Sequence, residues 1–519
     1  MGTTNYSNLL NQKSTKFYSD SSNINSLENM KNNLIDLSEK IQINIGIKNF
    51  EKGSSYQIHL FNIADNKKNP LNDDFECSST DDLTTYLIRP VIIRFYFEKQ
   101  QPLLIKIIKK DFSIEKNYEI KTTLGCIMGS RNNTWESKII SLETETLIVK
   151  AEKLKESEKV IKILFDINAI DKKVSFSSIK CKMYYEIFSD IILYRSECLS
   201  DNGIFDPVKI PVGLFKNNKI TVIFYKSNRK IRGNYTLDID DFVNETEFKF
   251  RVNGVYFRII SKSKITQNYT IVDYLKEKLD IGLSVAIDFT ASNGNPSDIN
   301  SLHSITSLEP NQYERAIRSC GNILSYYDSD QYYPCFGFGA KIGNTPYPIF
   351  NLNFEKDPNI KFIDGIINAY HKALKSVQLY GPTFFGPIIR EMNNFIKKEN
   401  DYSKYYILMI LTDGIIDDLD NTIEELVEVS NLPLSVIIIG VGKADFTNMN
   451  ILDADENPLN NSKGIKATRD LVQFVPFIKY EAKPENLTNE VLAEIPRQIV
   501  EYYEQKNLDP KKLAAMKKL

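Results

Sequence analysis

Cysteine is scarce in this chain, and its spacing excludes two kinds of stabilising site. The 519 residues contain six cysteines, and no two of them form a C-x-x-C pair. This spacing argues against a disulfide framework and against a zinc site, so a reducing, cytoplasmic compartment is expected. The polar segment 1–16 lacks the apolar core of a signal peptide, which favours the same compartment.

Long apolar runs and a net charge of one sign are also missing. No run approaches the ~20 apolar residues that span a bilayer. The 65 lysines and arginines nearly balance the 67 aspartates and glutamates. The overall charge therefore directs the chain neither to nucleic acid nor to a membrane, and we expect no nucleic-acid partner. Any membrane contact needs a local basic patch.

The pattern of apolar residues changes near residue 270. Before it, short apolar segments between turn residues are typical of all-β sandwiches, and a span of ~230 residues fits two of them. After it, apolar strands alternate with helical periodicity, which predicts an α/β doubly wound, Rossmann-like domain. We expect a disordered polar tail over 1–38, β domains over 39–142 and 143–270, the α/β domain over 271–506, and a basic tail over 507–519.

The expected elements are clearest where apolar residues run together. In the β domains, strands are predicted at 42–45, 91–97, 103–108, 147–149, 161–165, 220–224 and 248–252. In the α/β domain, strands are predicted at 283–287, 405–411 and 434–440, and helices at 311–327, 362–374, 387–396 and 494–505. Continuous apolar strands of this kind are typical of parallel sheets covered on both faces.

Oxygen-bearing side chains follow the predicted strands of the α/β domain. Asp288, Thr290 and Ser292 come directly after one strand, Asp413 after another, and Thr383 precedes a helix. Ligands of open α/β sheets bind beyond the carboxyl ends of the strands, so we expect these five residues to meet at the surface. Their carboxylate and hydroxyl oxygens predict a site for a hard cation such as Mg²⁺. Taken alone, D-x-T-x-S also fits a strand-end turn with a helix cap.

The five residues resemble the metal-ion-dependent adhesion site of von Willebrand factor A domains. The segments Val285–Pro296, Gly337–Lys341 and Ala493–Gln498 are similar to the copine version of this domain, and the likeness covers about 272–503. Copines carry two C2 domains before this module, which agrees with the two β regions. The resemblance implies a cytoplasmic adaptor in calcium signalling that associates peripherally with phospholipid membranes. It also implies recruitment of a protein partner through Mg²⁺ or Mn²⁺.

The two C2-type domains depart from the family in the loops that hold calcium. Ca²⁺ needs six to eight oxygens, largely from carboxylates. In the first β domain, 37–63 contains no aspartate, and the other loop retains only Asp111. The second keeps Asp171, but its other loop, 225–232, has no carboxylate. We therefore expect neither domain to bind Ca²⁺ in the usual way.

Positive side chains occupy the calcium-free loop of the second β domain. They are Lys226, Arg229, Lys230 and Arg232. Near an anionic leaflet each is worth about 1 kcal/mol, so the loop predicts calcium-independent binding to acidic phospholipid. A solvated basic hairpin is the alternative interpretation.

A metal-dependent phosphoryl-transfer or hydrolytic enzyme, with Asp288 and Asp413 holding Mg²⁺, is the alternative function. A phosphate-binding Walker loop is absent, because Gly442-Lys443 is followed by Ala444. Thr290 occupies the place where strand-end aspartyl phosphatases need a second carboxylate. We interpret His303 as a packed or hydrogen-bonded histidine rather than a general base. We therefore expect a binding protein and not an enzyme.

Overall fold

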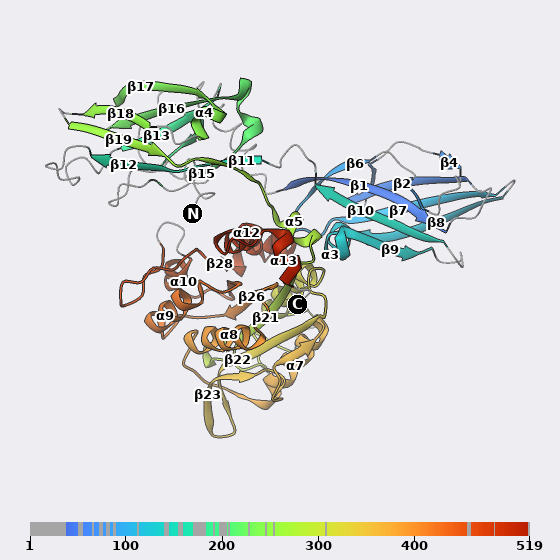
Figure 1. Ribbon diagram of the computed structural model, residues 1–519. Coiled ribbons are helices and arrows are strands. Elements are labelled where there is room, and N and C mark those ends of the chain that lie inside the picture. Colours follow the sequence, from blue (N-terminus) through green and yellow to red (C-terminus); the bar gives the residue numbers. More distant parts are fainter. Residues whose placement is uncertain are drawn as a thin grey trace. The chain divides into compact units, whose positions relative to one another are not determined.

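The computed structural model describes residues 38–516 with short gaps (Figure 1). The gaps are 50–54, 65–66, 72–75, 79–83, 87–89, 112–113, 140–144, 154–158, 170–182, 190–191, 197–204, 206–207, 227–228, 244–246, 253–254, 307–308, 454–457 and 482. The tail expected over 1–38 lies outside the described residues, apart from Ser38. The chain folds into two compact units, one including Leu154–Asn268 and the other Ser38–Lys153 with Tyr269–Leu519.

Two antiparallel sheets form the first β domain. One has the order β5-β1-β10-β9 with β6 also on β1, and the other has the order β3-β2-β7-β8 with β4 also on β2. Ile41, Ile43, Ile45 and Ile47 of β1 are fully buried, which is the alternation of a strand with one face on the core. The elements are β1 Glu39–Lys48, β2 Ser55–Ala64, β3 Lys67–Pro70, β4 Glu76–Ser78, β5 Thr84–Tyr86, β6 Val91–Phe95, β7 Pro102–Asp111, β8 Ile114–Thr123, α3 Leu124–Gly129, β9 Thr134–Lys138 and β10 Thr146–Lys153.

The boundary between the two β domains differs from the expected one. We ended the first domain at 142 and began the second at 143. The structure pairs β10 with β1, from Ile41 opposite Lys153 to Lys48 opposite Thr146, and also with β9. β10 therefore completes a sheet of the first domain. The expected boundary was wrong because the alternation of apolar and polar residues identifies a strand but does not show which sheet the strand joins.

The second β domain contains three antiparallel sheets, ordered β15-β11-β20, β12-β19-β18 and β14-β13-β16-β17. Phe165 lies at the centre of its core, with its ring 4.8 Å from that of Tyr185 and 5.3 Å from that of Phe224. The elements are β11 Lys159–Ile163, β12 Phe165–Ala169, β13 Met183–Phe188, β14 Ile192–Arg195, β15 Val208–Pro211, β16 Lys219–Lys226, β17 Arg229–Asp238, α4 Ile239–Val243, β18 Glu247–Val252, β19 Val255–Ser261 and β20 Lys264–Gln267.

The third domain is built on one open sheet with the order β23-β22-β21-β26-β27-β28. The five strands from β22 to β28 are parallel, and β23 is antiparallel at the edge. Counted in chain order the path is 3-2-1-4-5-6, a doubly wound arrangement. The strands are β21 Asp280–Asp288, β22 Tyr332–Ile342, β23 Thr345–Asn351, β24 Asn359–Lys361, β25 Gln378–Leu379, β26 Lys404–Thr412, β27 Leu434–Gly440 and β28 Val472–Pro476.

Helices cover both faces of this sheet (Figure 1). Along β26, Tyr405 and Ile407 pack in the core that contains α6, α7, α11 and α12, whereas Tyr406 and Leu408 pack in the core that contains α8, α9 and α10. Burial on both faces explains why these strands are continuously apolar. The helices are α5 Ile271–Lys276, α6 Gln312–Leu324, α7 Ile363–Ser376, α8 Gly386–Glu399, α9 Leu419–Val429, α10 Thr447–Leu452, α11 Pro484–Val491, α12 Ile495–Gln505 and α13 Pro510–Met516.

Residues 507–516 are packed, although we expected a basic tail over 507–519. α13 buries Leu513 completely in the domain core. The hydroxyl of Tyr274 on α5 donates to the carbonyl of Leu508, 3.0 Å away. Pro510 is also buried on α13, so two apolar residues anchor a segment that is otherwise rich in lysine.

The first β domain and the α/β domain share one core within their unit. The rings of Phe97 and Tyr327 stack with their centroids 4.6 Å apart. Gly125 and Gly129 of α3 lie against Tyr326, so closely that a Cβ on Gly129 would be 1.8 Å from the Tyr326 carbonyl oxygen. This junction needs glycine because no larger residue leaves room for the tyrosine.

Candidate metal centre

Four of the five predicted ligands lie together at the carboxyl ends of β21 and β26. Thr290 Oγ1 donates to Asp288 Oδ1 over 2.6 Å, and Ser292 Oγ donates to Asp413 Oδ1 over 2.9 Å. The two hydroxyl oxygens are themselves 2.9 Å apart. Two carboxylates and two hydroxyls therefore converge on one small volume.

The sheet itself brings these residues together. β21 and β26 are parallel neighbours, and Ile287 lies opposite Leu411, so the residues that follow meet at one edge. A turn over Ala291–Asn293 then directs Ser292 back toward Asp413. Asn293 fixes this turn by donating to the Thr290 carbonyl over 3.2 Å, and it accepts from the Tyr313 hydroxyl over 2.7 Å.

Burial decreases from the centre of the group toward solvent. We expected the whole site to lie at the surface, but Asp288 is completely buried and Thr290 and Asp413 are only 4% and 5% exposed. Ser292 is exposed. Asp288 is buried because helices cover both faces of the sheet, so the last residue of the strand is covered as well. Solvent, and any partner, approaches from the side of Ser292.

Burial raises the pKa of Asp288 to about 7, and the neighbouring charge of Asp413 adds to this effect. Burial also raises the pKa of Asp413. Thr412 opposes the shift by donating from Oγ1 to Asp288 Oδ2 over 2.6 Å. A divalent cation between the two buried carboxylates would cancel their mutual repulsion. It would also give their oxygens the positively charged partner that they lack. The donor set is all oxygen and fits Mg²⁺ or Mn²⁺.

Thr383 lies in the loop beside the one that carries Thr290 and Ser292. Within the described residues, its hydroxyl makes no hydrogen bond to the other four predicted ligands. The loop is attached through Tyr380, whose carbonyl accepts from Ala291 N over 3.0 Å. Thr383 N donates to Asp417 Oδ2 over 2.8 Å. The structure thus attaches the Thr383 loop to the loop that carries Thr290 and Ser292 through backbone hydrogen bonds, and the hydroxyl of Thr383 as a metal ligand stays a prediction.

Two aspartates that follow Asp413 hold the Thr383 loop in place. The Asp418 carboxylate accepts from Phe385 N over 2.9 Å and from Gly386 N over 3.0 Å, at the start of α8. Asp418 is thus a cap, but for a helix far away in the sequence. The loop that carries Asp413 therefore also positions the loop that carries Thr383.

Gly339 and Thr412 support the site, although neither was expected to. Gly339 has a φ of +73°, and a Cβ there would lie 2.4 Å from Thr290 Cγ2. Any other residue would push Thr290 away from the group. The sequence signals were the glycine in Gly337-Phe338-Gly339 and the threonine directly before Asp413, but neither reveals its spatial neighbour.

His303 is completely buried, and both of its ring nitrogens are engaged. Nε2 lies 2.8 Å from the Asp288 carbonyl oxygen, and Nδ1 lies 2.7 Å from the Tyr370 hydroxyl. Burial lowers its pKa to about 3, so the ring is neutral. The histidine fixes the end of β21 and is the hydrogen-bonded residue that we inferred from the sequence.

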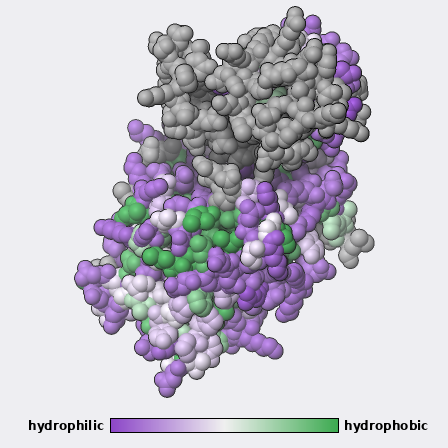
Figure 2. Space-filling view, turned by 90° about the vertical axis from the view of Figure 1, so that its left-hand side faces the viewer, coloured by the Kyte–Doolittle hydropathy of each residue, from purple (hydrophilic) through white to green (hydrophobic). Residues whose placement is uncertain are grey.

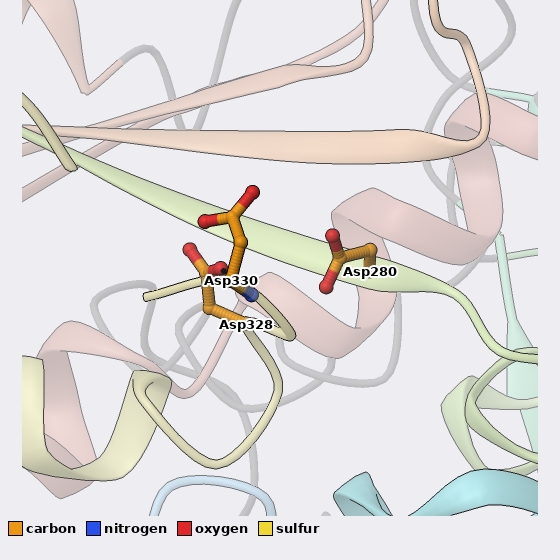
Figure 3. A group of neighbouring side chains, drawn as sticks. All are labelled: Asp280, Asp328 and Asp330. Carbon is orange, nitrogen blue, oxygen red and sulfur yellow. Dashed lines mark hydrogen bonds between the residues drawn. The ribbon is translucent and has the colours of Figure 1, made fainter. Parts of the chain in front are cut away.

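A second group of carboxylates, Asp280, Asp328 and Asp330, lies at the opposite end of β21 (Figure 3). The Lys404 ammonium nitrogen is 3.5, 3.6 and 3.3 Å from them, respectively. A cation of the chain itself already meets these carboxylates, so we interpret the group as an ion-pair cluster rather than a metal centre.

The calcium loops of the β domains fall largely outside the described residues. The side chains of Asp111 and of the four basic loop residues, as well as Asp171, are among those that the structure does not describe. The backbone of the basic loop is a hairpin in which Lys226 of β16 pairs with Arg229 of β17. The lipid-binding residues therefore remain predictions placed on one hairpin.

A buried ion pair lies beside the calcium-loop region of the first β domain. Lys109 Nζ is 3.0 Å from Glu145 Oε1, and the two side chains are 2% and 3% exposed. The Tyr56 hydroxyl donates to the same carboxylate over 2.7 Å. Lys109 lies two residues before Asp111 in the sequence of β7.

Residues 301–511 match the family model for the copine domain. The protein is copine-like. The match spans α6 to the start of α13 and includes Thr383 and Asp413, whereas Asp288 to Ser292 precede it. In the part of this copine-like chain that the structure describes, no helix is both long and apolar enough to cross a membrane.

Solved structures with some likeness to this copine-like chain are distant. A pair of C2 domains from extended synaptotagmin 2 is 8% identical, with coverage of 44% of this chain and 93% of that one and a TM-score of 0.17. Manganese-loaded TRAP protein of Plasmodium vivax is 15% identical, with coverage of 40% and 74% and a TM-score of 0.25. A human cytosolic phospholipase A2 is 7% identical, with coverage of 57% and 45% and a TM-score of 0.16. At these TM-scores none of them carries an argument about this chain.

Proposed function

We propose that this copine-like protein is an adaptor that associates peripherally with acidic phospholipid membranes and recruits a protein partner through a metal ion. The β domains bind the membrane, and the von Willebrand A-type domain binds the partner. The observation that carries the second part is the hydrogen-bonded group of Asp288, Thr290, Ser292 and Asp413 at one sheet edge. The compartment that fits this role is the cytoplasm.

The charge of the group suits a metal that remains attractive to an anion. Two carboxylates just balance a divalent cation, and hydroxyls add no charge. Bound Mg²⁺ or Mn²⁺ would supply an electrophilic point for an acidic residue of the partner. Asp288 and Asp413 would hold the ion, and the exposed Ser292 marks the open side.

Binding is favoured over catalysis by the state of the nearest histidine. A hydrolytic or phosphoryl-transfer reaction at Mg²⁺ held by Asp288 and Asp413 needs a base beside the metal. His303 is buried and neutral, with both nitrogens engaged. We therefore propose a binding function and no enzymatic one.

Membrane association is proposed to be independent of calcium. In the first β domain, the calcium-loop segments 37–63 and 109–111 offer a single aspartate, Asp111, which is too little negative charge to hold Ca²⁺. In the second, the basic hairpin provides the positive charge that bound calcium would otherwise supply. The chain thereby keeps the attraction to anionic lipid without the ion.

Calorimetric titration of the EDTA-treated full chain with Mg²⁺ and Mn²⁺ tests the metal part directly. We expect one site in the wild type and no binding by Asp288→Asn, which keeps the shape of the side chain. Asp330→Asn is the matched control, because it removes a carboxylate from the cluster around Lys404, and it should bind as the wild type does. Equal binding by Asp288→Asn, or loss in Asp330→Asn alone, would place the metal elsewhere.

A further inference from the structure

Each loop of the candidate metal centre leaves at least one large apolar side chain in solvent. Ile299 is 72% exposed, Tyr380 45% and Ile415 55%. The contrast with the next residue is sharp, because Ile416 is only 4% exposed and packs in the core. The chain thus buries one of two adjacent isoleucines and presents the other.

Backbone contacts tie all three residues to the metal loops. The Tyr380 carbonyl accepts from Ala291 N over 3.0 Å. Ile299 belongs to a segment that folds back on the first loop, where Leu302 N donates to the Asn293 carbonyl over 3.0 Å.

Ile415 lies one residue beyond Gly414. A Cβ on that glycine would be 4.0 Å from Ser292 Oγ. The three exposed apolar residues thus lie on segments that run beside the loop carrying Thr290 and Ser292.

Exposed apolar side chains indicate an interaction site when they cluster around a polar site. Scattered ones are ordinary on a protein surface, but apolar patches with a polar rim mark interaction sites. Figure 2, which labels no residue, shows an apolar area among hydrophilic residues on one face of the molecule. A positive charge is also present at the metal loops, since Lys341 Nζ lies 3.5 Å above the centre of the Tyr380 ring.

Resting on the proposed function, we infer that the metal-dependent partner presents an aspartate or glutamate flanked by large apolar residues. The carboxylate completes the shell of the ion. The apolar neighbours cover Ile299, Tyr380 and Ile415 and exclude water from the ionic contact, which strengthens it. The metal ion thus requires an acidic residue in the partner, and the three exposed side chains determine which acidic segments bind.

A protein segment fits this surface better than a membrane. A lipid leaflet offers many phosphates over a plane, whereas one ion held by the buried Asp288 and Asp413 would attract a single anionic group from the side of the exposed Ser292. Lys341 is held over an aromatic ring, where a lone carboxylate can pair with it. One acidic residue with apolar neighbours on both sides matches this pattern of charge.

Selection from a random peptide library displayed on phage tests the inference on the full chain. Phages are bound in Mg²⁺ and Mn²⁺ and released with EDTA. Enriched peptides should contain an aspartate or glutamate within two or three positions of leucine, isoleucine, phenylalanine or tyrosine. An Ile299→Ala/Ile415→Ala variant should bind such a peptide at least about tenfold more weakly, with unchanged affinity for Mg²⁺.

Matched controls come from exposed apolar residues in other parts of the chain. Ile92→Ala, at a position 60% exposed in the first β domain, controls for the isoleucines. Tyr347→Ala, at a position 41% exposed on β23, controls for Tyr380→Ala. Both should bind the peptide as the wild type does.

The outcomes separate this inference from the proposed function. Absence of Mg²⁺ and Mn²⁺ binding overturns both. Metal binding without EDTA-released peptides, acidic peptides without apolar neighbours, or full affinity in the isoleucine variant overturns only the inference. Loss of Mg²⁺-dependent binding to phosphatidylserine vesicles in that variant, with peptide binding intact, would assign the surface to lipid and also overturns it.

Discussion

Thr383 and Asp417 hold each other through two hydrogen bonds. Thr383 N donates to Asp417 Oδ2 over 2.8 Å, and Asp417 N donates back to the Thr383 carbonyl over 2.9 Å. Asp417 is four residues beyond Asp413, so one loop supplies a carboxylate and also positions its neighbour. The place of Thr383 at the metal centre depends on this pair.

Asp417→Ala should weaken the binding of Mg²⁺ about tenfold, the range found for residues that orient metal ligands. Alanine removes the acceptor of Thr383 N, so the neighbouring loop loses its support while all five predicted ligands remain. Asp417→Asn keeps an oxygen in place and should retain most of the affinity. Calorimetry measures both variants, and equal affinity in Asp417→Ala and the wild type would show that Thr383 is not positioned in this way.

The convergence of Asp288 and Asp413 could be predicted from the sequence because it rests on two general rules. Apolar runs locate buried strands, and parallel strands present their carboxyl ends at the same edge. The contribution of Thr412 and Gly339 could not be predicted. Thr412 reaches Asp288 only because β26 lies beside β21, and Gly339 matters only because Thr290 packs against its Cα.

Assignments made from local pattern alone failed where long-range pairing decides the structure. β10 was expected in the second β domain, yet its partners are β1 and β9 of the first. Likewise, Leu513 gains its role only by entering the core of a domain whose other residues lie far earlier in the chain. Element type was readable from alternation and composition, whereas element partners were not.

Gly129→Ala should open the junction between the first β domain and the α/β domain. The added Cβ would lie 1.8 Å from the Tyr326 carbonyl oxygen, and backbone atoms cannot move aside as a side chain can. We expect a cost of about 1–3 kcal/mol, typical of overpacking. Thermal unfolding measures the loss, and small-angle scattering measures the separation of the domains.

Gly213→Ala is the matched control for this substitution. Its added Cβ meets nothing within 4 Å, so stability and dimensions should stay as in the wild type. If Gly129→Ala behaves in the same way, the tight contact with Tyr326 does not hold the junction together.

Glu39 gives the same junction a pH dependence. Burial raises its pKa from 4.5 to about 7, against the opposing hydrogen bond from Thr270 and the charge of Lys153. The folded state therefore holds the proton more tightly than the unfolded state, and stability falls as the pH rises from about 4.5 to about 7. Between pH 5 and pH 8 the wild type should lose roughly 2–3 kcal/mol more than Glu39→Gln.

Urea unfolding of both proteins at pH 5 and pH 8 measures this difference. Burial also raises the pKa of Asp328 to about 7. Such acids contribute equally to the pH dependence of unfolding in both proteins, so their effect cancels in the comparison. A pH dependence that is the same in Glu39→Gln and in the wild type would mean that Glu39 titrates at its ordinary pKa.

The basic hairpin of the second β domain makes a prediction about membranes. Replacing Lys226, Arg229, Lys230 and Arg232 with alanine should weaken binding to phosphatidylserine vesicles at least tenfold. Each positive charge near an anionic leaflet is worth about 1 kcal/mol, so four together amount to far more than one factor of ten. Co-sedimentation with vesicles measures the change.

Two comparisons decide whether the hairpin, rather than charge in general, binds the membrane without calcium. A variant with alanine at four other lysines of the same domain removes equal charge and should bind as the wild type does; these are Lys209, Lys219, Lys249 and Lys264. Wild-type binding should be the same with Ca²⁺ and with chelator and should weaken with salt, because the attraction is electrostatic and screened. Binding that appears only with Ca²⁺ would contradict our expectation that neither β domain binds Ca²⁺ in the usual way. An equal loss of vesicle binding in both variants would mean that the hairpin is only one of several basic surfaces that contribute.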